Sequence, residues 1–291
     1  MPAAPTLSIG MPVYNGAKWI QEAIEYLLNQ SFTDFELIVS DNASTDETAD
    51  ICRRFAARDS RVRYHRHNSN IGVFRNYDYV FQLSTTPYFK WASCNDICLD
   101  GFLEKCLAVL RDRPDVVLAY PKAILIFAPS GEEPYGQEYD DNLNLEQERP
   151  SDRFRDYLNR EKINNVMNGV IRASALRETA LNRLLPGSDI SMIAELALRG
   201  KFVEIPDRLF VRRLTPDTTI LLMESARSHG YLGRPDNIQR LKLHSYRFLD
   251  TLRAPIPLSE KLRVWLYLLR RVAWLRHRAM RKVFKVLTGR G

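Results

Sequence analysis

The chain has 291 residues, 45% of them hydrophobic and 26% charged, values typical of a soluble protein of one large or two small domains. No apolar run reaches about 18 residues and the first residues do not resemble a cleavable signal, so we expect neither a membrane-spanning helix nor a secretory leader. The net charge of +7 lies at the end of the chain, where residues 259–291 hold ten Lys/Arg and one Asp/Glu. The remaining 32 basic and 34 acidic residues nearly balance, which argues against a nucleic-acid-binding body.

The regular alternation of apolar runs in the first 120 residues predicts a parallel sheet with helices on both faces. Strands are expected at 7–15, 35–40, 62–65, 88–92 and 116–120, and helices at 17–30, 46–58, 73–83 and 100–111. The four cysteines, Cys52, Cys94, Cys98 and Cys106, lack paired metal-site spacing, and Cys98 and Cys106 fall in a helical pattern. We expect reduced thiols in a cytoplasmic protein.

The second half is less regular. Residues 129–150 are expected to form a long surface loop, followed by helices at 153–160, 175–181 and 190–198 and strands at 166–172, 202–205 and 208–213. From about residue 217 the pattern is helical, and the last helix, 260–287, is basic and amphipathic with Leu262, Trp265, Leu266 and Leu269 on its apolar side.

Polar residues cluster where the predicted strands end, at Asn15, at 41–46 and at 95–96. Sheets of this kind bind ligands at those strand ends. The chain has no Gly-x-Gly-x-x-Gly and no Walker loop, so dinucleotide dehydrogenases and P-loop enzymes are disfavoured.

One of these clusters ends on Asp96, directly before a predicted helix. Taken alone, Asp96 or Asp100 could cap that helix, or Asp96 could hold a metal ion bound to phosphates.

Five motifs then occur in order over residues 5–215. They are residues 11–15, 39–46, 70–72 with 75–76, the Asp96 segment, and 187–189 with 194–196. Together they resemble the inverting family-2 nucleotide-sugar glycosyltransferases of the GT-A fold.

The resemblance implies an α/β, Rossmann-like GT-A domain with a mostly parallel sheet flanked by helices. Residues 1–120 would be its nucleotide-sugar-binding half, 121–215 its acceptor-binding half, and 216–291 a helical C-terminal extension. The implied donor-binding residues are Pro12, Val13, Tyr14, Asn15, Asp41, Asn70, Arg75, Asn95, Asp96 and Arg213.

The same resemblance assigns two carboxylates. Asp96 matches the last position of the family's Asp-x-Asp motif, which binds the Mg²⁺ or Mn²⁺ bridging the donor diphosphate, and Asp189 matches the catalytic base. A base must take the proton of the attacking hydroxyl, and a cation must offset charge on the leaving diphosphate. Asp189 or Ser188 could instead cap the next helix. Glu195 is a second candidate base, although a salt bridge is the commoner role for it.

Two departures concern the metal. The Asp-x-Asp triplet is replaced by Cys94-Asn95-Asp96, and Thr215 stands where relatives carry a histidine after Arg212-Arg213. The diphosphate could hold the metal, Arg212 and Arg213 could partly replace it, or activity could be lost. Arg213 could also be a structural ion-pair partner.

For the basic helix, two interpretations stay open. It could lie on an anionic membrane with Trp265, Tyr267 and Trp274 near the headgroups, as a peripheral protein of the inner face, or it could pack on the domain or on a second subunit of a homo-oligomer.

We therefore expect an inverting, hexosyltransferase-like enzyme. It would transfer sugar from a nucleotide-diphosphate donor to a saccharide or lipid-linked glycan, as in bacterial surface-polysaccharide synthesis. The alternative is a degenerate member that binds nucleotide or glycan without catalysis. A nucleotidyltransferase is disfavoured because no Gly-rich, lysine-containing phosphate loop lies near the N-terminus.

Overall fold

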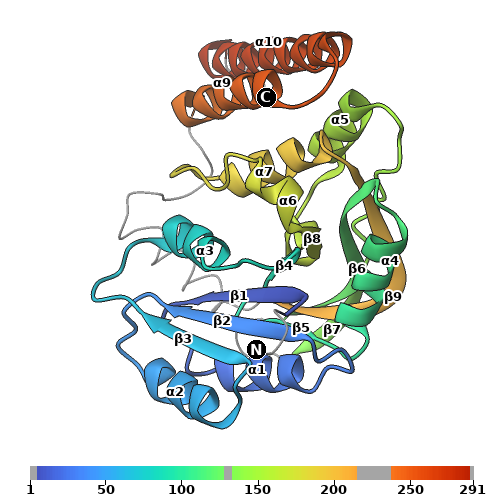
Figure 1. Cartoon of the computed structure of the whole chain (residues 1–291). Coiled ribbons are helices and arrows are strands. Elements are labelled where there is room, and N and C mark those ends of the chain that lie inside the picture. The colour runs from blue at the N-terminus through green and yellow to red at the C-terminus, as the bar shows by residue number, and fades with distance from the viewer. Residues whose placement is uncertain (1–4, 128–132, 215–236, 289–291) are drawn as a thin grey trace.

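The computed structural model describes residues 5–127, 133–214 and 237–288, without the side chains of 237 and 274–288. A curled nine-stranded sheet, with helices on its faces, forms the centre of the molecule (Figure 1). Its strand order is β3-β2-β1-β4-β8-β6-β9-β5, and β7 pairs with β6. This is the mixed α/β architecture that the sequence predicts.

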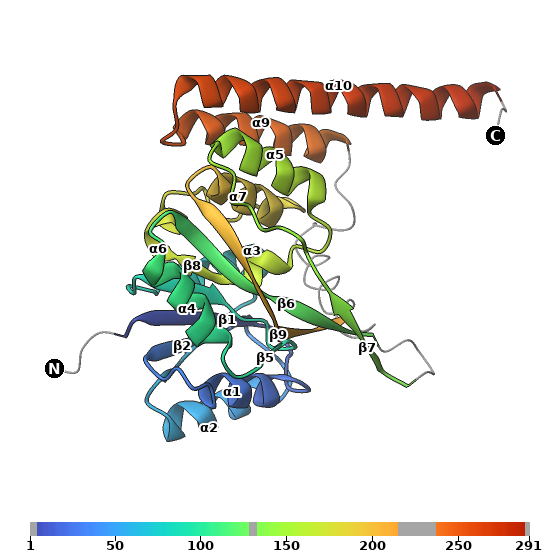
Figure 2. The same cartoon turned by 90° about the vertical axis from the view of Figure 1, so that its right-hand side faces the viewer.

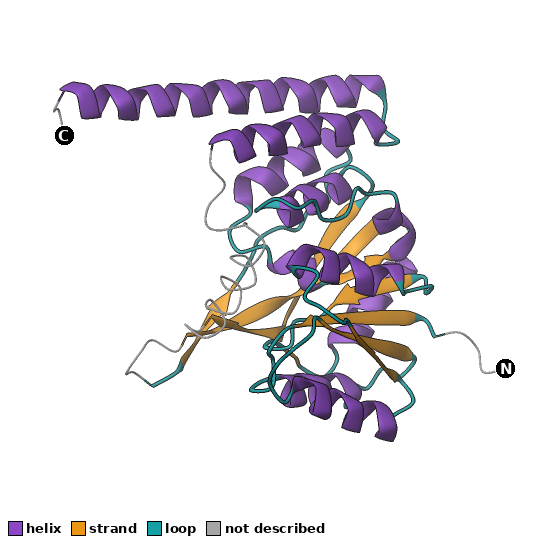
Figure 3. Ribbon diagram, turned by 90° about the vertical axis from the view of Figure 1, so that its left-hand side faces the viewer, coloured by secondary structure: helices purple, strands orange, loops and turns teal. Residues whose placement is uncertain are grey.

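The first half of the sheet is parallel. It contains β1 (Leu7–Val13), β2 (Phe35–Asp41), β3 (Val62–Arg66) and β4 (Tyr88–Trp91). The connecting helices are α1 (Ile20–Leu28), α2 (Thr48–Arg58) and α3 (Val73–Gln82). Side chains alternate between faces along a strand, so Leu37 and Val39 join one core cluster with α1 and α2, and Ile38 joins the other with α3. Helices therefore cover both faces of these strands (Figure 3).

The second half mixes directions, because β8 (Val170–Arg172) runs antiparallel between β4 and β6. The other strands are β5 (Ile97–Cys98), β6 (Val116–Phe127), β7 (Tyr135–Tyr139) and β9 (Lys201–Leu214). The helices are α4 (Phe102–Asp112), α5 (Pro150–Arg160), η1 (Asn165–Asn168), α6 (Ala173–Arg177) and α7 (Ser188–Ala197).

Four expectations for these segments were wrong. The predicted loop at 129–150 contains β7, whose residues are nearly all exposed and so give no apolar alternation. The strand expected at 166–172 is η1 followed by β8, and the strands at 202–205 and 208–213 are one strand, β9. Cys98 lies in β5 rather than in a helix, because α4 begins only after Gly101, whose φ is 83°. All four cysteines are free, as predicted.

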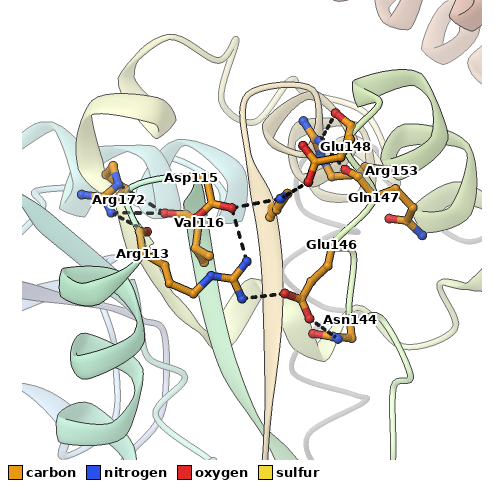
Figure 4. A network of polar contacts seen from close by, with 10 residues as sticks. Arg113, Asp115, Val116, Asn144, Glu146, Gln147, Glu148, Arg153 and Arg172 are labelled. Atoms are coloured by element: carbon orange, nitrogen blue, oxygen red, sulfur yellow. Dashed lines mark hydrogen bonds and ion pairs between the residues drawn. The ribbon is translucent and has the colours of Figure 1, made fainter.

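A network of charged side chains attaches residues 144–148 to the starts of β6 and β9 (Figure 4). Arg113 contacts both Asp115, at 3.3 Å, and Glu146, at 2.5 Å. Lys201 pairs with Asp115 and with Glu148. The three carboxylates of this network are exposed, so the network positions this segment more than it stabilises the fold.

Two helices, α9 (Asn237–Arg253) and α10 (Leu258–Thr288), form a hairpin at the end of the molecule farthest from α1 and α2 (Figure 2). Val264 and Leu268 of α10 are buried in the core that includes Phe154 of α5. The Tyr267 hydroxyl donates to Asn159 Oδ1 at 2.8 Å, and the Trp265 ring lies beside Phe248.

This arrangement confirms that α10 packs on the domain, and it corrects the predicted apolar side. Leu262, Leu266 and Leu269 are exposed, whereas Trp265 packs on α9 and Tyr267 contacts α5. Trp274 lies outside the described side chains. In the described part of the chain, every helix is too short or too polar to span a bilayer.

Glu260 joins α10 to α5. Its Oε2 accepts hydrogen bonds from the backbone N–H of Ser151, at 3.1 Å, and from the Ser151 hydroxyl, at 2.5 Å. Because Ser151 lies in the first turn of α5, the carboxylate satisfies an N–H that has no partner within that helix and opposes the positive end of its dipole. Burial would raise the pKa of Glu260, but the bonds from Ser151 lower it overall.

We expect Glu260→Gln to lower the free energy of unfolding by about 1 kcal/mol at pH 7, since it weakens a charge-assisted contact. A lowered carboxyl pKa stabilises the fold above the unfolded-state value and the effect is lost as pH falls. The difference between wild type and variant should therefore shrink below about pH 4.5. Urea denaturation at two pH values measures it, with the exposed Glu133→Gln as control. An equal loss at both pH values would contradict this role.

Candidate functional site

The turn after β1 is held against the loop after β2. Asn15 has a φ of 51°, its N–H donates to Ser44 Oγ at 2.9 Å, and its Oδ1 accepts from the Thr45 N–H at 2.8 Å. Asn tolerates this left-handed backbone better than most residues. The segment that begins with Asp41 therefore lies at the same sheet edge as four candidate donor residues, Pro12, Val13, Tyr14 and Asn15.

Asp41 is fully buried at the end of β2. Its Oδ1 accepts from the Ser44 N–H at 2.8 Å, and its Oδ2 accepts from the Tyr64 hydroxyl at 2.7 Å. Arg66 lies 3.7 Å from Oδ2. Both oxygens already have protein partners, so a ligand at this point would share the carboxylate with them.

The remaining N-terminal candidates lie along one loop and the helix that follows it. Asn70 Oδ1 accepts from Asn42 Nδ2, at 2.8 Å, and from the Gly72 N–H, at 2.9 Å. Arg75 is exposed in the first turn of α3. The loop after β2 is thus tied directly to the start of α3.

Asp96 lies just before β5 and is 8% exposed. Its Oδ1 accepts from the backbone N–H of Arg213 in β9 at 3.1 Å. Burial raises the pKa of Asp96 to about 6, although Arg212, the Arg213 N–H and Lys90 act in the opposite direction. Lys90 is itself fully buried in β4. Helix α4, which follows Asp96 and Asp100 in the chain, has no side-chain cap hydrogen bond, so capping by either carboxylate is not observed.

Arg213 has a structural role as well. Its guanidinium pairs with Glu22 of α1 at 2.7 Å, donates to the Asn95 carbonyl at 3.1 Å and stacks on the Trp19 ring. Asn95 Oδ1 accepts from the Ser93 hydroxyl. The ion-pair interpretation of Arg213 is therefore confirmed.

The protein offers few ligands to a metal at this corner. Among the described residues no group of three or more His, Cys, Asp and Glu side chains could hold an ion. Burial and the charge of Asp96 raise the pKa of Cys94 to about 12, so this thiol stays protonated near neutral pH. Thr215 lies outside the described residues.

Asp189 lies in the first turn of α7, behind Gly187, whose φ is 80°. The helix has no side-chain cap bond, so the capping alternative for Asp189 and Ser188 is not observed. Asn164 Nδ2 donates to Asp189 Oδ2 at 2.8 Å, and Tyr157 donates to Asn164 Oδ1 at 2.7 Å. A buried tyrosine and a buried asparagine thus orient the carboxylate.

Glu195, the second candidate base, is 2% exposed and pairs with Arg199 at 3.0 Å. It also accepts from the Ala180 N–H at 3.0 Å. These contacts agree with a structural role.

Tyr77 of α3 is near enough to both candidate carboxylates for their charges to affect its pKa. Burial raises the pKa of Tyr77, Asp96 and Asp189 raise it further by their negative charge, and Arg212 opposes them. The Arg212 guanidinium donates to the Ile163 carbonyl at 2.6 Å and to Asn165 Oδ1 at 2.7 Å. Because Asn164 binds Asp189 and Asn165 binds Arg212, this one segment joins the two sides of the site.

Asp141 was not identified from the sequence. It is 4% exposed, and neither carboxylate oxygen has a hydrogen-bond partner among the described residues. Burial raises its pKa to about 7; Asn165 lies near enough to lower the value, although its Nδ2 makes no hydrogen bond of normal geometry. The neighbouring Asp140 pairs with Lys122 and Arg208 on the surface. Nothing in the local sequence distinguishes the two.

Residues 8–185 match the family model described as glycosyl transferase family 2. Among curated relatives, "Glycosyltransferase GlyG" of Streptococcus pneumoniae serotype 4 is 26% identical over 113 residues, which is 38% of each chain. Chondroitin synthase of Escherichia coli is 34% identical over 106 residues, 34% of this chain and 15% of the relative. The first three relatives are matched over 36–40% of their length.

Two solved structures show the same fold at low sequence identity. Staphylococcus aureus TarS 1–349 has a TM-score of 0.63 at 14% identity, over 91% of this chain and 70% of that one. It is also known in complex with UDP-GlcNAc. The mannosyltransferase PcManGT of Pyrobaculum calidifontis, in complex with GDP-Man and Mn²⁺, has a TM-score of 0.54 at 14% identity, over 98% and 81% of the two chains.

We expect Asp96→Asn to raise the free energy of unfolding of the ligand-free protein, because it removes a buried charge. A carboxyl with its pKa raised to about 6 stabilises the fold only when protonated, and this contribution is lost as pH rises. The gain should be up to about 3 kcal/mol at pH 7.5 and about half of that at pH 5. Urea denaturation measures both values. Asp100→Asn is the control, since the pKa of exposed Asp100 is lowered by Ser31 and its removal should bring no gain. A destabilised Asp96→Asn protein at pH 7.5 would contradict the electrostatic account.

Proposed function

The chain belongs to glycosyl transferase family 2, and from that membership we propose that it is an inverting glycosyltransferase using a nucleotide-diphosphate sugar. The acceptor is a saccharide or a lipid-linked glycan, as in bacterial surface-polysaccharide synthesis. The observation that carries this proposal is a series of hydrogen bonds that links Asp96 and Asp189 from opposite halves of the domain. Asn164 binds Asp189, the next residue, Asn165, binds Arg212, and the N–H of the adjacent Arg213 binds Asp96. Asp96 suits a donor diphosphate and Asp189 an acceptor hydroxyl.

We assign the donor to residues 1–120 and the acceptor to residues 121–215. The donor residues are Pro12, Val13, Tyr14, Asn15, Asp41, Asn70, Arg75, Asn95, Asp96 and Arg213. The UDP-GlcNAc and GDP-Man complexes of the two solved structures support a nucleotide-diphosphate donor. Chondroitin synthase supports a saccharide acceptor by its name. The four free cysteines support a cytoplasmic site of action.

In the reaction, the acceptor oxygen attacks the anomeric carbon while the bond from that carbon to the diphosphate oxygen breaks. The hydroxyl proton passes to Asp189, and the nucleoside diphosphate leaves. Asn164 keeps Asp189 Oδ2 in a fixed orientation. A single displacement inverts the anomeric configuration. Arg212, whose charge lowers the pKa of Asp96, would offset part of the negative charge on the leaving group.

A divalent cation fits this corner if the donor supplies most of its ligands. Asp96 would hold it, and Mg²⁺ binds readily through one carboxylate, water and substrate phosphates. Bound there, the ion would neutralise charge on the diphosphate. The Mn²⁺ in the mannosyltransferase complex supports the assignment. Arg213 is less available as a substitute cation, since Glu22 already pairs with it.

The replacement of the triplet by Cys94-Asn95-Asp96 favours a second candidate, a family member that binds nucleotide or glycan without turnover. Only one carboxylate of the motif remains, and Cys94 stays protonated. Activity measurements separate the two candidates.

We expect release of nucleoside diphosphate from at least one sugar nucleotide in a panel that includes UDP-GlcNAc and GDP-Man, measured with Mn²⁺ or Mg²⁺. Asp189→Asn should lower kcat by about 100-fold to 10,000-fold, because the base is lost, with little change in affinity for the nucleoside diphosphate. Glu195→Gln is the matched carboxylate control on the same helix, and its loss of activity should track its loss of stability. Full turnover by Asp189→Asn would remove it as the base. Nucleotide binding without turnover, with glycan acceptors present, would favour the second candidate.

Asp96→Asn or EDTA should weaken binding of the nucleoside diphosphate by at least about tenfold, because the carboxylate and the ion act together. Calorimetric titration with and without Mn²⁺ measures this. Wild-type affinity that is indifferent to EDTA would rule out the metal role of Asp96.

A further inference from the structure

The exposed apolar side chains of the described chain are concentrated on one end of the molecule. Eleven large hydrophobic residues are exposed, and eight of them lie on α9 and α10. On α10 they are Leu258, Leu262, Leu266 and Leu269, between 49% and 66% exposed. On α9 they are Ile238, Leu241, Leu249 and Leu252. Scattered single leucines need no explanation, but a row of this kind marks an interaction surface.

The spacing of the α10 leucines makes a continuous row. With 3.6 residues per turn, residues 258, 262, 266 and 269 fall within one narrow stripe along the helix. The buried Val264 and Leu268 lie on the other side, against the body. The helix thus has two apolar sides, and the domain covers only one.

The charges around this row are of one sign. Lys242, Arg253, Arg263 and Arg270 are exposed. Between residues 238 and 273 the acidic side chains are Asp250 and Glu260, and both are buried. Asp250 contacts Arg183, and Glu260 contacts Ser151 and lies 3.6 Å from exposed Arg263. Residues 274–288, which continue the helix, add five Lys/Arg and no Asp/Glu.

We propose that the exposed leucine row of α10, flanked by Arg263 and Arg270 and extended by α9, docks on the surface of an anionic lipid bilayer. Leucines would enter the region between headgroups and acyl chains, and the cations would lie among anionic headgroups. The helices lie along the bilayer rather than across it, consistent with the lack of a spanning helix among the described residues. This face differs from the aromatic one expected from the sequence, since Trp265 packs on α9 and Tyr267 contacts α5.

A second copy of the chain is a poorer occupant. A twofold interface brings the same patch of both subunits together, so Arg263 and Arg270 would meet cations of the partner. Lipid headgroups carry the opposite charge, so a bilayer can pair with the arginines and also bury the leucines beneath its headgroups.

The direction of α10 bears on the acceptor. Its C-terminal half runs beyond the body on the side where the β6–β7 hairpin ends (Figure 2). A bilayer along α10 would therefore also extend over that side of the molecule. A lipid-linked acceptor would then reach the domain from the same surface. This step rests on the proposed function, whereas lipid docking does not.

The test is sedimentation of the full chain with vesicles of phosphatidylcholine alone and of phosphatidylcholine mixed with phosphatidylglycerol. We expect binding to the mixed vesicles only, weakening as salt is raised. The triple variant Leu262→Gln, Leu266→Gln, Leu269→Gln should reduce the partition coefficient by at least about tenfold, and Arg263→Glu with Arg270→Glu by a similar factor. All five positions are exposed, so we expect the variants to stay folded and a loss of binding to report on the surface itself. Leu184→Gln and Arg58→Glu are matched exposed controls and should bind as wild type does.

Three results would overturn the proposal. They are no binding to the mixed vesicles, unchanged binding by the triple leucine variant, and a wild-type dimer in sedimentation velocity that the triple variant converts to monomer. Release of nucleoside diphosphate without vesicles is measured in parallel. Failure of that reaction concerns the proposed function, and failure of vesicle binding concerns this surface.

Discussion

The two halves of the domain meet through a hydrogen bond between residues 117 positions apart in the chain, from the Arg213 N–H to Asp96 Oδ1. This bond places the end of β9 beside Asp96, next to the pairing of β9 with β5. Arg213 strengthens the junction through Glu22 and Trp19 of the first half. Together with the pairing of β4 with β8 and of β5 with β9, this contact joins the half that carries Asp96 to the half that carries the proposed base.

Several buried or strained residues of the domain show a conflict between stability and function. Asp96 and Asp141 are buried carboxyls with raised pKa values, and Asp141 has no hydrogen-bond partner among the described residues. An unsatisfied buried polar group costs about 1–3 kcal/mol. Asn15 and Asn164 add backbone at positive φ. Such features cluster where a protein binds or reacts, since packing alone would not select them.

Different layers of the molecule carry the candidate donor corner, the proposed base and the outward-facing apolar surface. The parallel strands β1 to β4 end at the candidate donor corner, α7 and the segment before η1 supply the proposed base and its support, and the α9–α10 hairpin presents leucines and cations outward. Glu260 connects the hairpin to α5 by satisfying Ser151. The outer surface is thus fixed to the catalytic domain by a specific polar contact as well as by the apolar contacts of Val264 and Leu268.

The sequence by itself determined the elements of the first 120 residues apart from the two-residue strand β5, because apolar periodicity and short turns are local properties. It also marked Asp96 and Asp189 through motifs that keep their order. Tertiary structure decided what local patterns cannot carry: that exposed β7 is a strand, that Arg213 binds Glu22, and that Asp141 is buried while Asp140 is paired at the surface. It also decided which side of α10 remains uncovered. The leucines and the aromatic residues of that helix are equally apolar in the sequence, and only the position of α5 and α9 determines which of them are buried.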